Sequence, residues 1–410
     1  MQQLLATLIL IGTFILLITE KLPRTYAALV GAGLAIVLGV LPSGEALSAI
    51  NIEVLSTIIG LMVMTEAFSR TGLFDSLATF LVISSKGSSR LLHSLLVVTI
   101  YILSMIISNI AAILIVIPIT IRAMRKLGID PKMTLMTEAI AVNIGGIGLP
   151  ISSIPNVMVC IESGLGMSDF LTRITPASIL LLMVCLLISL KNIPKVTKPI
   201  EGGLRVDMGG LSLSSFRYIA AFIVSLILII AYDMFGMTLP VAALIAGSIA
   251  LLVSKESPEV LKEIDWPTIF FLSGIFVVIR GAERTGLLTS LSDAFSTTVG
   301  GNSQLAMPLI LWVSATTSAA IDNIPITATL IPVINGLKGI GSVRWWALIL
   351  GANLGGNFTA IGSPSNIILL GLSRRYGVVV SFKEFSRYGT IHTTVYLILC
   401  TLYLYVMYWF

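Results

Sequence analysis

The chain interrupts its apolar sequence twice in the same way, at positions about 210 residues apart. Asn143 precedes a Gly-Gly pair and then Asn156, and Asn353 precedes a Gly-Gly pair and then Asn366. Such paired interruptions in two halves of a membrane protein are the best sequence indication of a secondary transporter's binding site. The pattern therefore predicts two related halves that build one site.

Two further matches support this division into halves. Ser108-Asn109 corresponds to Asp322-Asn323, and a proline follows each pair at the same distance. Further upstream, the Arg-Thr-Gly-Leu run at 70–73 corresponds to the same run at 284–287.

Composition places the chain in a membrane. Of its 410 residues, 56% are hydrophobic and 11% are charged, whereas a soluble domain carries about 25% charged residues. Long, uniformly apolar runs predict an all-α polytopic membrane protein rather than a barrel, whose strands alternate. The net charge of +5 lies in membrane-flanking loops, so we expect the lipid bilayer and no nucleic acid as a partner. The three cysteines show no metal-binding spacing, and we expect no metal site and no organic cofactor.

The expected architecture has about ten transmembrane helices plus two re-entrant hairpins, in two inverted-topology repeats with broken helices. The first repeat is expected at 1–190, with a hairpin at 91–123 and a broken helix at 133–162. A linker follows at 191–215. The second repeat is expected at 216–410, with a hairpin at 305–336 and a broken helix at 344–371. Unbroken spans are expected at 4–20, 25–42, 52–68, 174–190, 216–232, 239–253, 266–282 and 388–409. Amphipathic stretches are expected at 71–85 and 286–298.

Each hairpin could instead be two short spans. We favour hairpins because the arms are shorter than the ~20 residues that cross a bilayer. Their polar tips also fall in mid-run, where irregular backbone is tolerated only against protein or a water-filled cavity.

The distribution of basic residues indicates the topology. Most of the 25 Lys and Arg residues lie on the side of Lys21 and Lys191, which places the linker in the cytoplasm of a cell (plasma or inner) membrane. Both termini are then external, the first hairpin enters from inside, and the second enters from outside.

The hairpin tips place oxygen-bearing side chains in the middle of apolar sequence, where polar groups usually line a pathway. Asp322 is the acidic residue among them, so we expect it to bind a sodium ion or a proton as the coupling ion. Alternatively, it only caps a following helix. The predicted coupling-ion site comprises Ser108, Asn109, Asn143, Gly145, Ser318, Asp322, Asn323, Asn353 and Gly355.

The broken spans supply free backbone groups. An unwound segment offers carbonyls to a cation, and the amino end of the helix that restarts favours an anion or a polar solute. Close packing through the glycines is the alternative. The predicted substrate-binding residues are Ser152, Ser153, Asn156, Thr359, Ser363, Ser365 and Asn366.

Two further carboxylates are possible proton sites. Glu138 lies one helical turn before Asn143 and is otherwise an interfacial residue. Glu66 lies at a position equivalent to Arg280, and each of these side chains could instead extend to a membrane surface.

At these residues the chain resembles the ion transporter superfamily, in the branch of arsenite permeases, NhaD-type sodium–proton antiporters and the melanosomal P protein. Residues 318–332 are similar to the outer hairpin of that branch, and 353–366 are similar to its broken-helix motif, although Ser363 stands where the branch commonly has Asp. The resemblance implies a permease fold, a homodimer, and a mobile part that moves as an elevator.

Taken together, the sequence favours a secondary-active, ion-coupled transporter of the arsenite or anion permease type, carrying a small inorganic ion or oxyanion. A sodium–proton antiporter of the NhaD type is the alternative within the class, and an ion channel is a further one. We expect no enzyme, because no nucleophile turn or phosphate-binding loop is present.

Overall fold

A computed structural model describes residues 1–19, 21–69, 83–197, 213–254, 257–299, 302–337 and 340–409. The Arg-Thr-Gly-Leu run at 70–73, most of the amphipathic stretch 71–85 and most of the linker 191–215 lie outside these ranges. In the described part, regular structure is helical apart from one isolated bridge between Ser88 and Thr197.

The first half consists of helices with one sharp change of direction in each predicted broken run. These are α1 (Gln2–Thr19), α2 (Arg24–Val37), α3 (Ser43–Ala46), α4 (Ile52–Ser69), α6 (Ser89–Ile106), α7 (Asn109–Lys126), α8 (Lys132–Gly145), α9 (Ile154–Ser163), α10 (Met167–Asp169) and α11 (Thr175–Ser189). A π-helical turn, Phe170–Ile174, joins α10 to α11, and a 3-10 turn, Leu190–Asn192, follows α11.

The second half repeats this order. Its helices are α12 (Leu213–Ile230), α13 (Leu239–Val253), α14 (Ser257–Lys262), α15 (Trp266–Arg284), α16 (Leu287–Val299), α17 (Ser303–Ser318), α18 (Asn323–Asn335), α19 (Val343–Gly355), α20 (Pro364–Arg375) and α21 (Phe382–Trp409). A 3-10 turn, Tyr232–Phe235, separates α12 from α13.

Several described helices are suited to a bilayer. Six are long and apolar enough to cross a membrane, and shorter apolar helices such as α2, α9, α13 and α18 accompany them. A span needs about 20 residues, so shorter helices end inside a membrane. Such ends are tolerated there only where other helices shield the backbone from lipid. The expected all-α polytopic class is confirmed.

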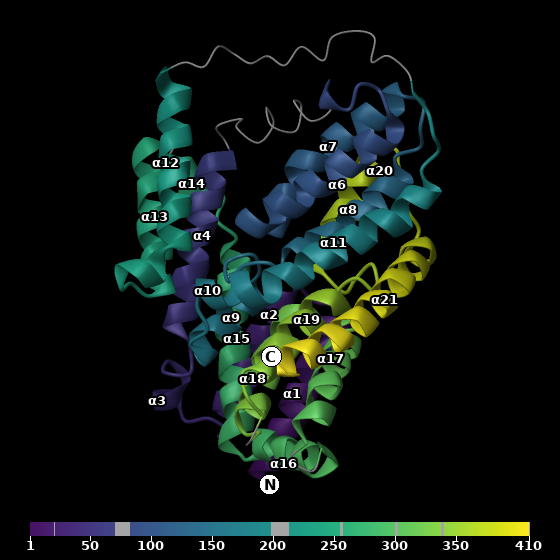
Figure 1. The fold of residues 1–410 in the computed structure, drawn as a ribbon. Helices are drawn as coiled ribbons and strands as arrows, with labels where there is room; N and C mark the ends of the chain where they lie inside the picture. Colours follow the sequence, from purple (N-terminus) through teal and green to yellow (C-terminus); the bar gives the residue numbers. More distant parts are fainter. Residues whose placement is uncertain are drawn as a thin grey trace.

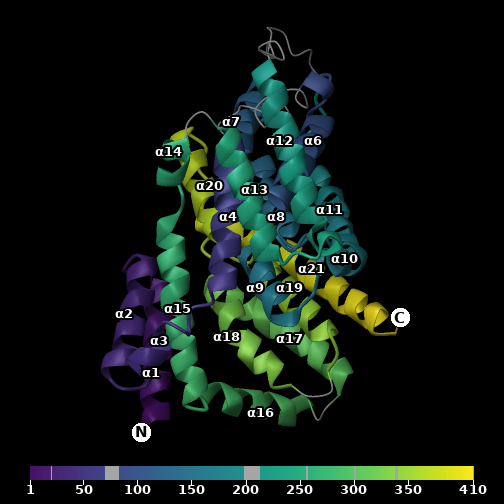
Figure 2. The ribbon, with the colours of Figure 1, turned by 90° about the vertical axis from the view of Figure 1, so that its left-hand side faces the viewer.

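Two helix bundles combine elements of both halves. One joins α1 and α2 to α15, and the other joins α12 and α13 to α4. Each bundle thus takes the first two helices of one half and the third long helix of the other. Figure 2 shows the two bundles as separate groups, with α1, α2 and α15 below and α12, α13 and α4 above.

Small residues set the spacing within both bundles. A Cβ atom built on Gly60 of α4 would lie 2.4 Å from the carbonyl carbon of Ala243 in α13, and one on Gly274 of α15 would lie 2.8 Å from that of Ala28 in α2. Because lipid supplies no hydrophobic drive between apolar helices, close backbone approach of this kind stabilises their association.

Gly60→Ala is therefore expected to lower the thermal stability of the purified protein. Overpacking costs about 1–3 kcal/mol, which outweighs the gain of about 1 kcal/mol from replacing a helical glycine by alanine. Gly12→Ala is the matched control, because a Cβ on Gly12 would meet nothing within 4 Å. Equal melting temperatures for the two variants would rule out tight α4–α13 packing.

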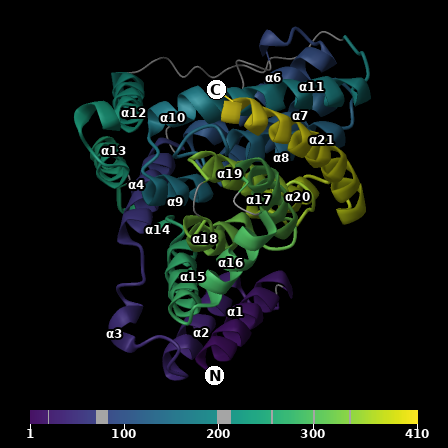
Figure 3. The ribbon, with the colours of Figure 1, turned by 60° about the horizontal axis from the view of Figure 1, so that its bottom comes forward.

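The remaining helices form the part that carries the breaks (Figure 1). Here α6 packs on α8 and α17 packs on α19, while α18 contacts α9 and α20 contacts α7, so the halves interlock. In Figure 3, α6, α11 and α21 run along one side of the molecule, and α1, α2 and α15 lie on the other.

Three helix boundaries differ by four or more residues from those predicted. The span expected at 25–42 ends at Val37, because Gly39 adopts a left-handed conformation (φ 72°) that stops a helix. The helix expected to end at 371 continues to Arg375, and the one expected to begin at 388 begins at Phe382. Polar and basic residues at these two ends made the apolar run shorter than the helix.

Candidate functional site

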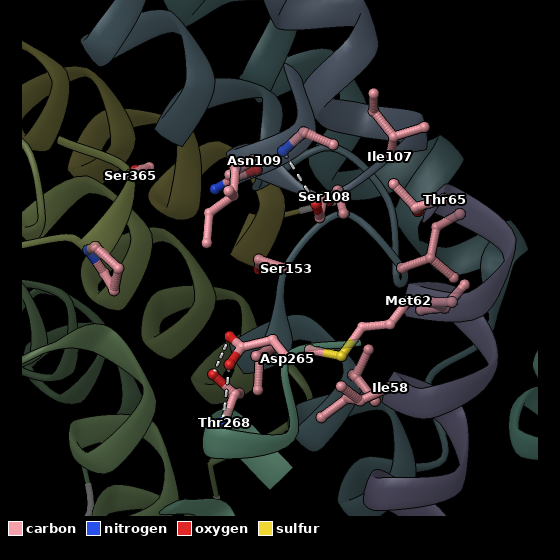
Figure 4. A pocket seen from close by; sticks show the side chains of 18 of the residues that line it. Ile58, Met62, Thr65, Ile107, Ser108, Asn109, Ser153, Asp265, Thr268 and Ser365 are labelled. Carbon is pink, nitrogen blue, oxygen red and sulfur yellow. Dashed lines mark hydrogen bonds between the residues drawn. The ribbon is translucent and has the colours of Figure 1, made fainter. Parts of the chain in front are cut away.

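Four helix amino ends approach one cavity. α7, α9, α18 and α20 each begin just after a break, and residues at all four starts line a cavity of about 340 Å³. α4 contributes an apolar wall that includes Ile58 and Met62, whereas polar groups of the hairpin tip and of α15 lie opposite (Figure 4). Helix amino ends carry partial positive charge and unpaired N–H groups, so these ends favour negative charge. The carboxylates of Glu66, Glu263 and Asp265 also line the cavity.

The tip of the first hairpin lies at the cavity. Ser108 precedes α7, and its hydroxyl accepts a hydrogen bond from the amide of Ala111 at 3.2 Å. The side-chain oxygen of Asn109 accepts a hydrogen bond from Ser104 at 2.6 Å, and the Ser104 hydroxyl also lies 2.6 Å from the carbonyl of Val142. The tip is thereby fixed to the end of α8.

The second hairpin is fixed in a related way. The Ser318 hydroxyl donates to the carbonyl of Ala352 at 2.7 Å. Ala352 directly precedes Asn353, as Val142 directly precedes Asn143. Ser318 and Ser104 therefore make the same contact, each with the carbonyl before the asparagine of its broken helix. Asn323 is buried at the start of α18 and lines the cavity.

Asp322 has partners in its own hairpin and in a helix of one bundle. Its Oδ1 accepts from the amide of Ile324 at 3.3 Å, so the residue does cap α18. Its Oδ2 lies 3.1 Å from Nη1 of Arg24, which is the first residue of α2. The carboxylate is thus held between its own hairpin and one of the two bundles.

Two asparagines fill the unwound segments of the broken helices. The amide nitrogen of Asn156 donates to the carbonyls of Gly146, Ile147 and Leu149 at 2.7–3.1 Å. In the other half, the amide nitrogen of Asn366 donates to the carbonyls of Gly356 and Thr359 at 2.8 and 3.3 Å. Carbonyls that a helix would have paired are therefore satisfied by a side chain of the same half.

Two further predicted asparagines, Asn143 and Asn353, join the halves to each other. Asn353 donates to Oδ1 of Asn156 at 3.1 Å, and Asn143 donates to Oδ1 of Asn357 at 2.7 Å. The Asn143 nitrogen also lies 3.4 Å from Oδ1 of Asn366. All of these side chains are buried. These asparagines thus form two buried clusters across the interface between the halves, Asn156 with Asn353 and Asn143 with Asn357 and Asn366.

The two predicted glycines allow close packing. A Cβ on Gly145 would lie 2.5 Å from the carbonyl oxygen of Tyr101, and one on Gly355 would lie 2.3 Å from that of Ala315. Each glycine lets a broken helix press against the first arm of its own hairpin. This is the packing alternative that the sequence left open.

The predicted serines and threonine connect the same parts. Ser363 and Ser365 lie 2.7 Å apart, and each hydroxyl is 3.3 Å from Oδ1 of Asn143. Thr359 donates to the carbonyl of Ala319 next to the second hairpin tip at 2.9 Å. The remaining two, Ser152 and Ser153, line the cavity beside α9.

The two possible proton sites lie in different places. Glu66 lines the cavity from α4, and the ion pair of Arg280 is formed with Glu283 on its own helix at 2.7 Å. Glu138 is fully buried between α8 and α7, where Thr120 donates to its Oε1 at 2.5 Å. Among the described residues, its Oε2 has no hydrogen-bond partner.

Several residues of the site were not predicted. Arg24 lies 298 positions from Asp322, so no local pattern links them. Ser104 could have been found, because the spacing that relates Asn109 to Asn323 also relates Ser104 to Ser318. Asn357 breaks the repeat, since Ile147 occupies the equivalent position relative to the Asn-X-Gly-Gly motif.

The fold and this site define a polytopic membrane transporter. Residues 14–351 match the model of CitMHS, described as a citrate transporter. The chain therefore belongs to the CitMHS family. An uncharacterized transporter of Mycobacterium tuberculosis is 30% identical over 433 residues, which cover 99% of each chain.

Two other similarities agree with the family. The P protein of Homo sapiens is 26% identical over 490 residues, covering 95% of this chain and 58% of that protein. The crystal structure of the Alcanivorax borkumensis YdaH transporter has a TM-score of 0.62 with 15% identity, covering 99% of this chain and 98% of that one. At this identity the likeness concerns the fold. The expected membership of the ion transporter superfamily is confirmed.

Proposed function

We propose that the chain is a secondary-active carrier that couples the movement of a small anion to that of a sodium ion or a proton. The convergence of four helix amino ends on one cavity carries this proposal. Such ends bind carboxylate and oxyanion groups through N–H donors and the helix dipole. A polycarboxylate such as citrate, which the family description names, has the matching charge.

Asp322 is the proposed site of the coupling ion. It caps α18 at the hairpin tip, beside the cavity-lining Asn323. A carboxylate within membrane-spanning sequence is costly, and such residues usually mark an ion or substrate pathway. Oxygen ligands suit sodium, and the same carboxylate can carry a proton.

The proposed motion is that of an elevator. The hairpins and broken helices are bound together by the two buried asparagine clusters and by Ser104 and Ser318, which supports their movement as one body. The bundles of α1, α2 and α15 and of α4, α12 and α13 would remain in place. Homodimer formation through such a scaffold is part of the proposal.

Substrate competition in proteoliposomes tests the choice of an anion. Uptake of labelled citrate by purified protein should be reduced by excess unlabelled tricarboxylate or small oxyanions, and should be unaffected by an uncharged solute of similar size. Inhibition by the uncharged solute alone would exclude an anion site. Binding of neither class, with protein that still responds to a sodium gradient, would favour the sodium–proton antiporter.

A further inference from the structure

Arg24 connects the tip of the second hairpin to the bundle formed by α1, α2 and α15. Its Nη1 lies 3.1 Å from Oδ2 of Asp322, and its Nη2 lies 3.2 Å from the hydroxyl of Thr268 on α15. The guanidinium also lies over the ring of Phe271, 5.6 Å from its centre. One cation therefore contacts α15 and α18 from the first residue of α2.

The exposure of this pair distinguishes it from a surface salt bridge. The side chain of Arg24 is 33% exposed and that of Asp322 is 16% exposed. Surface pairs are worth little because water screens them. A partly buried ion pair costs more to break, because each charge then lacks its partner and is only poorly solvated by water.

A second carboxylate is linked to the guanidinium through the hydroxyl of Thr268. Thr268, which Arg24 contacts, donates to Oδ2 of Asp265 at 2.5 Å. Asp265 and Thr268 both line the cavity with Arg24, and Figure 4 shows the two residues facing each other across a hydrogen bond. If Asp322 is released, Arg24 keeps its contact with Thr268, which links it to the carboxylate of Asp265.

We infer that Arg24 is a tethered cation that occupies Asp322 in the ion-free protein, and that a sodium ion displaces it. This inference rests on the proposed function, in which Asp322 binds the coupling ion, and it names sodium as that ion. One cation replaces another, so the carboxylate remains paired throughout. Displacement releases the hairpin tip from α2 and α15, and Arg24 passes to Asp265.

Competition predicts opposite effects of two substitutions on sodium binding. Arg24→Gln removes the competing charge and should lower the apparent Kd for sodium at least tenfold. Asp265→Asn removes the second partner, holds Arg24 at Asp322 and should raise that Kd, while its side-chain oxygen can still cap α15. A purely structural contact would weaken sodium binding or leave it unchanged in both variants.

The measurement is the melting temperature of purified full-length protein as sodium replaces choline at constant ionic strength. Arg24→Lys, which keeps the positive charge, should bind sodium nearly as weakly as the wild type. Arg280→Gln is the matched control, since Arg280 pairs with Glu283 on its own exposed helix face, and its sodium response should equal that of the wild type.

The outcomes separate this inference from the function on which it rests. A sodium response that Asp322→Asn abolishes and Arg24→Gln strengthens supports both. If Asp322→Asn abolishes the sodium response but Arg24→Gln leaves it unchanged, Arg24 does not compete with sodium, and Asp322 remains the sodium site. No sodium response in the wild type overturns the sodium exchange, and citrate uptake driven by a pH gradient alone would then show that the carrier function survives.

Discussion

Asp322→Asn is expected to abolish ion-driven transport while leaving a folded protein. Asparagine keeps the oxygen that caps α18 but removes the charge that a cation requires. Hydrogen bonds and contacts to a charged group are worth about 1.5–3 kcal/mol, so the ion-driven transport rate should fall about 100-fold. Initial rates in proteoliposomes under an imposed sodium or proton gradient measure this loss.

The control for this substitution is Asp169→Asn. The Asp169 carboxylate accepts from the amide of Gly166 at 2.9 Å, away from the hairpin tips, and makes the same kind of local contact. Its replacement should change the transport rate little. Full ion-driven activity in Asp322→Asn would remove this carboxylate from the coupling step.

Asn156→Asp is expected to be the most destabilising of the single changes proposed. The substitution replaces the donor group that satisfies the carbonyls of Gly146, Ile147 and Leu149 with an acceptor of the same shape. Among the described residues, the carbonyl of Ile147 would lose its partner, whereas Ser152 also donates to the carbonyls of Gly146 and Leu149. A buried group left without a partner costs about 1–3 kcal/mol and a charged one costs more, so with the new buried carboxylate the total is about 4 kcal/mol or more. The yield of monodisperse protein and its melting temperature should both drop.

Asn51→Asp is a stringent comparison for that change. At the start of α4, the side-chain oxygen of Asn51 accepts from the amide of Val54 at 3.0 Å, and among the described residues its side chain makes no other hydrogen bond. Aspartate caps a helix as well as asparagine does, so stability should be nearly unchanged. If Asn156→Asp were equally harmless, the broken helix could not depend on the Asn156 amide.

The sequence predicted the features that arise locally. Gly, Pro, Asn and Ser inside apolar runs indicate where a helix must stop, and α6 ends at Ile106 just before the predicted tip at Ser108. The all-α membrane class follows from length and hydropathy in the same way. Boundaries at 37 and 382 were missed, because hydropathy follows the apolar run and not the backbone that ends a helix.

The contacts between distant segments could not be predicted in this way. The amide of an asparagine can serve an ion or another side chain, and only the packing of the halves places Asn143 against Asn357. Likewise, the guanidinium of Arg24 reaches Asp322 because α2 packs on α15 of the other half. Repeat symmetry relates equivalent positions, but it does not say which surfaces of the halves meet.

The most direct measurement is the uptake of labelled citrate by proteoliposomes under an imposed sodium or proton gradient, with internal pH recorded at the same time. We predict accumulation above the external concentration that an ionophore abolishes and that Asp322→Asn lacks. Citrate that only equilibrates would indicate a channel. Sodium-driven proton movement without any anion would contradict the anion carrier and establish the antiporter.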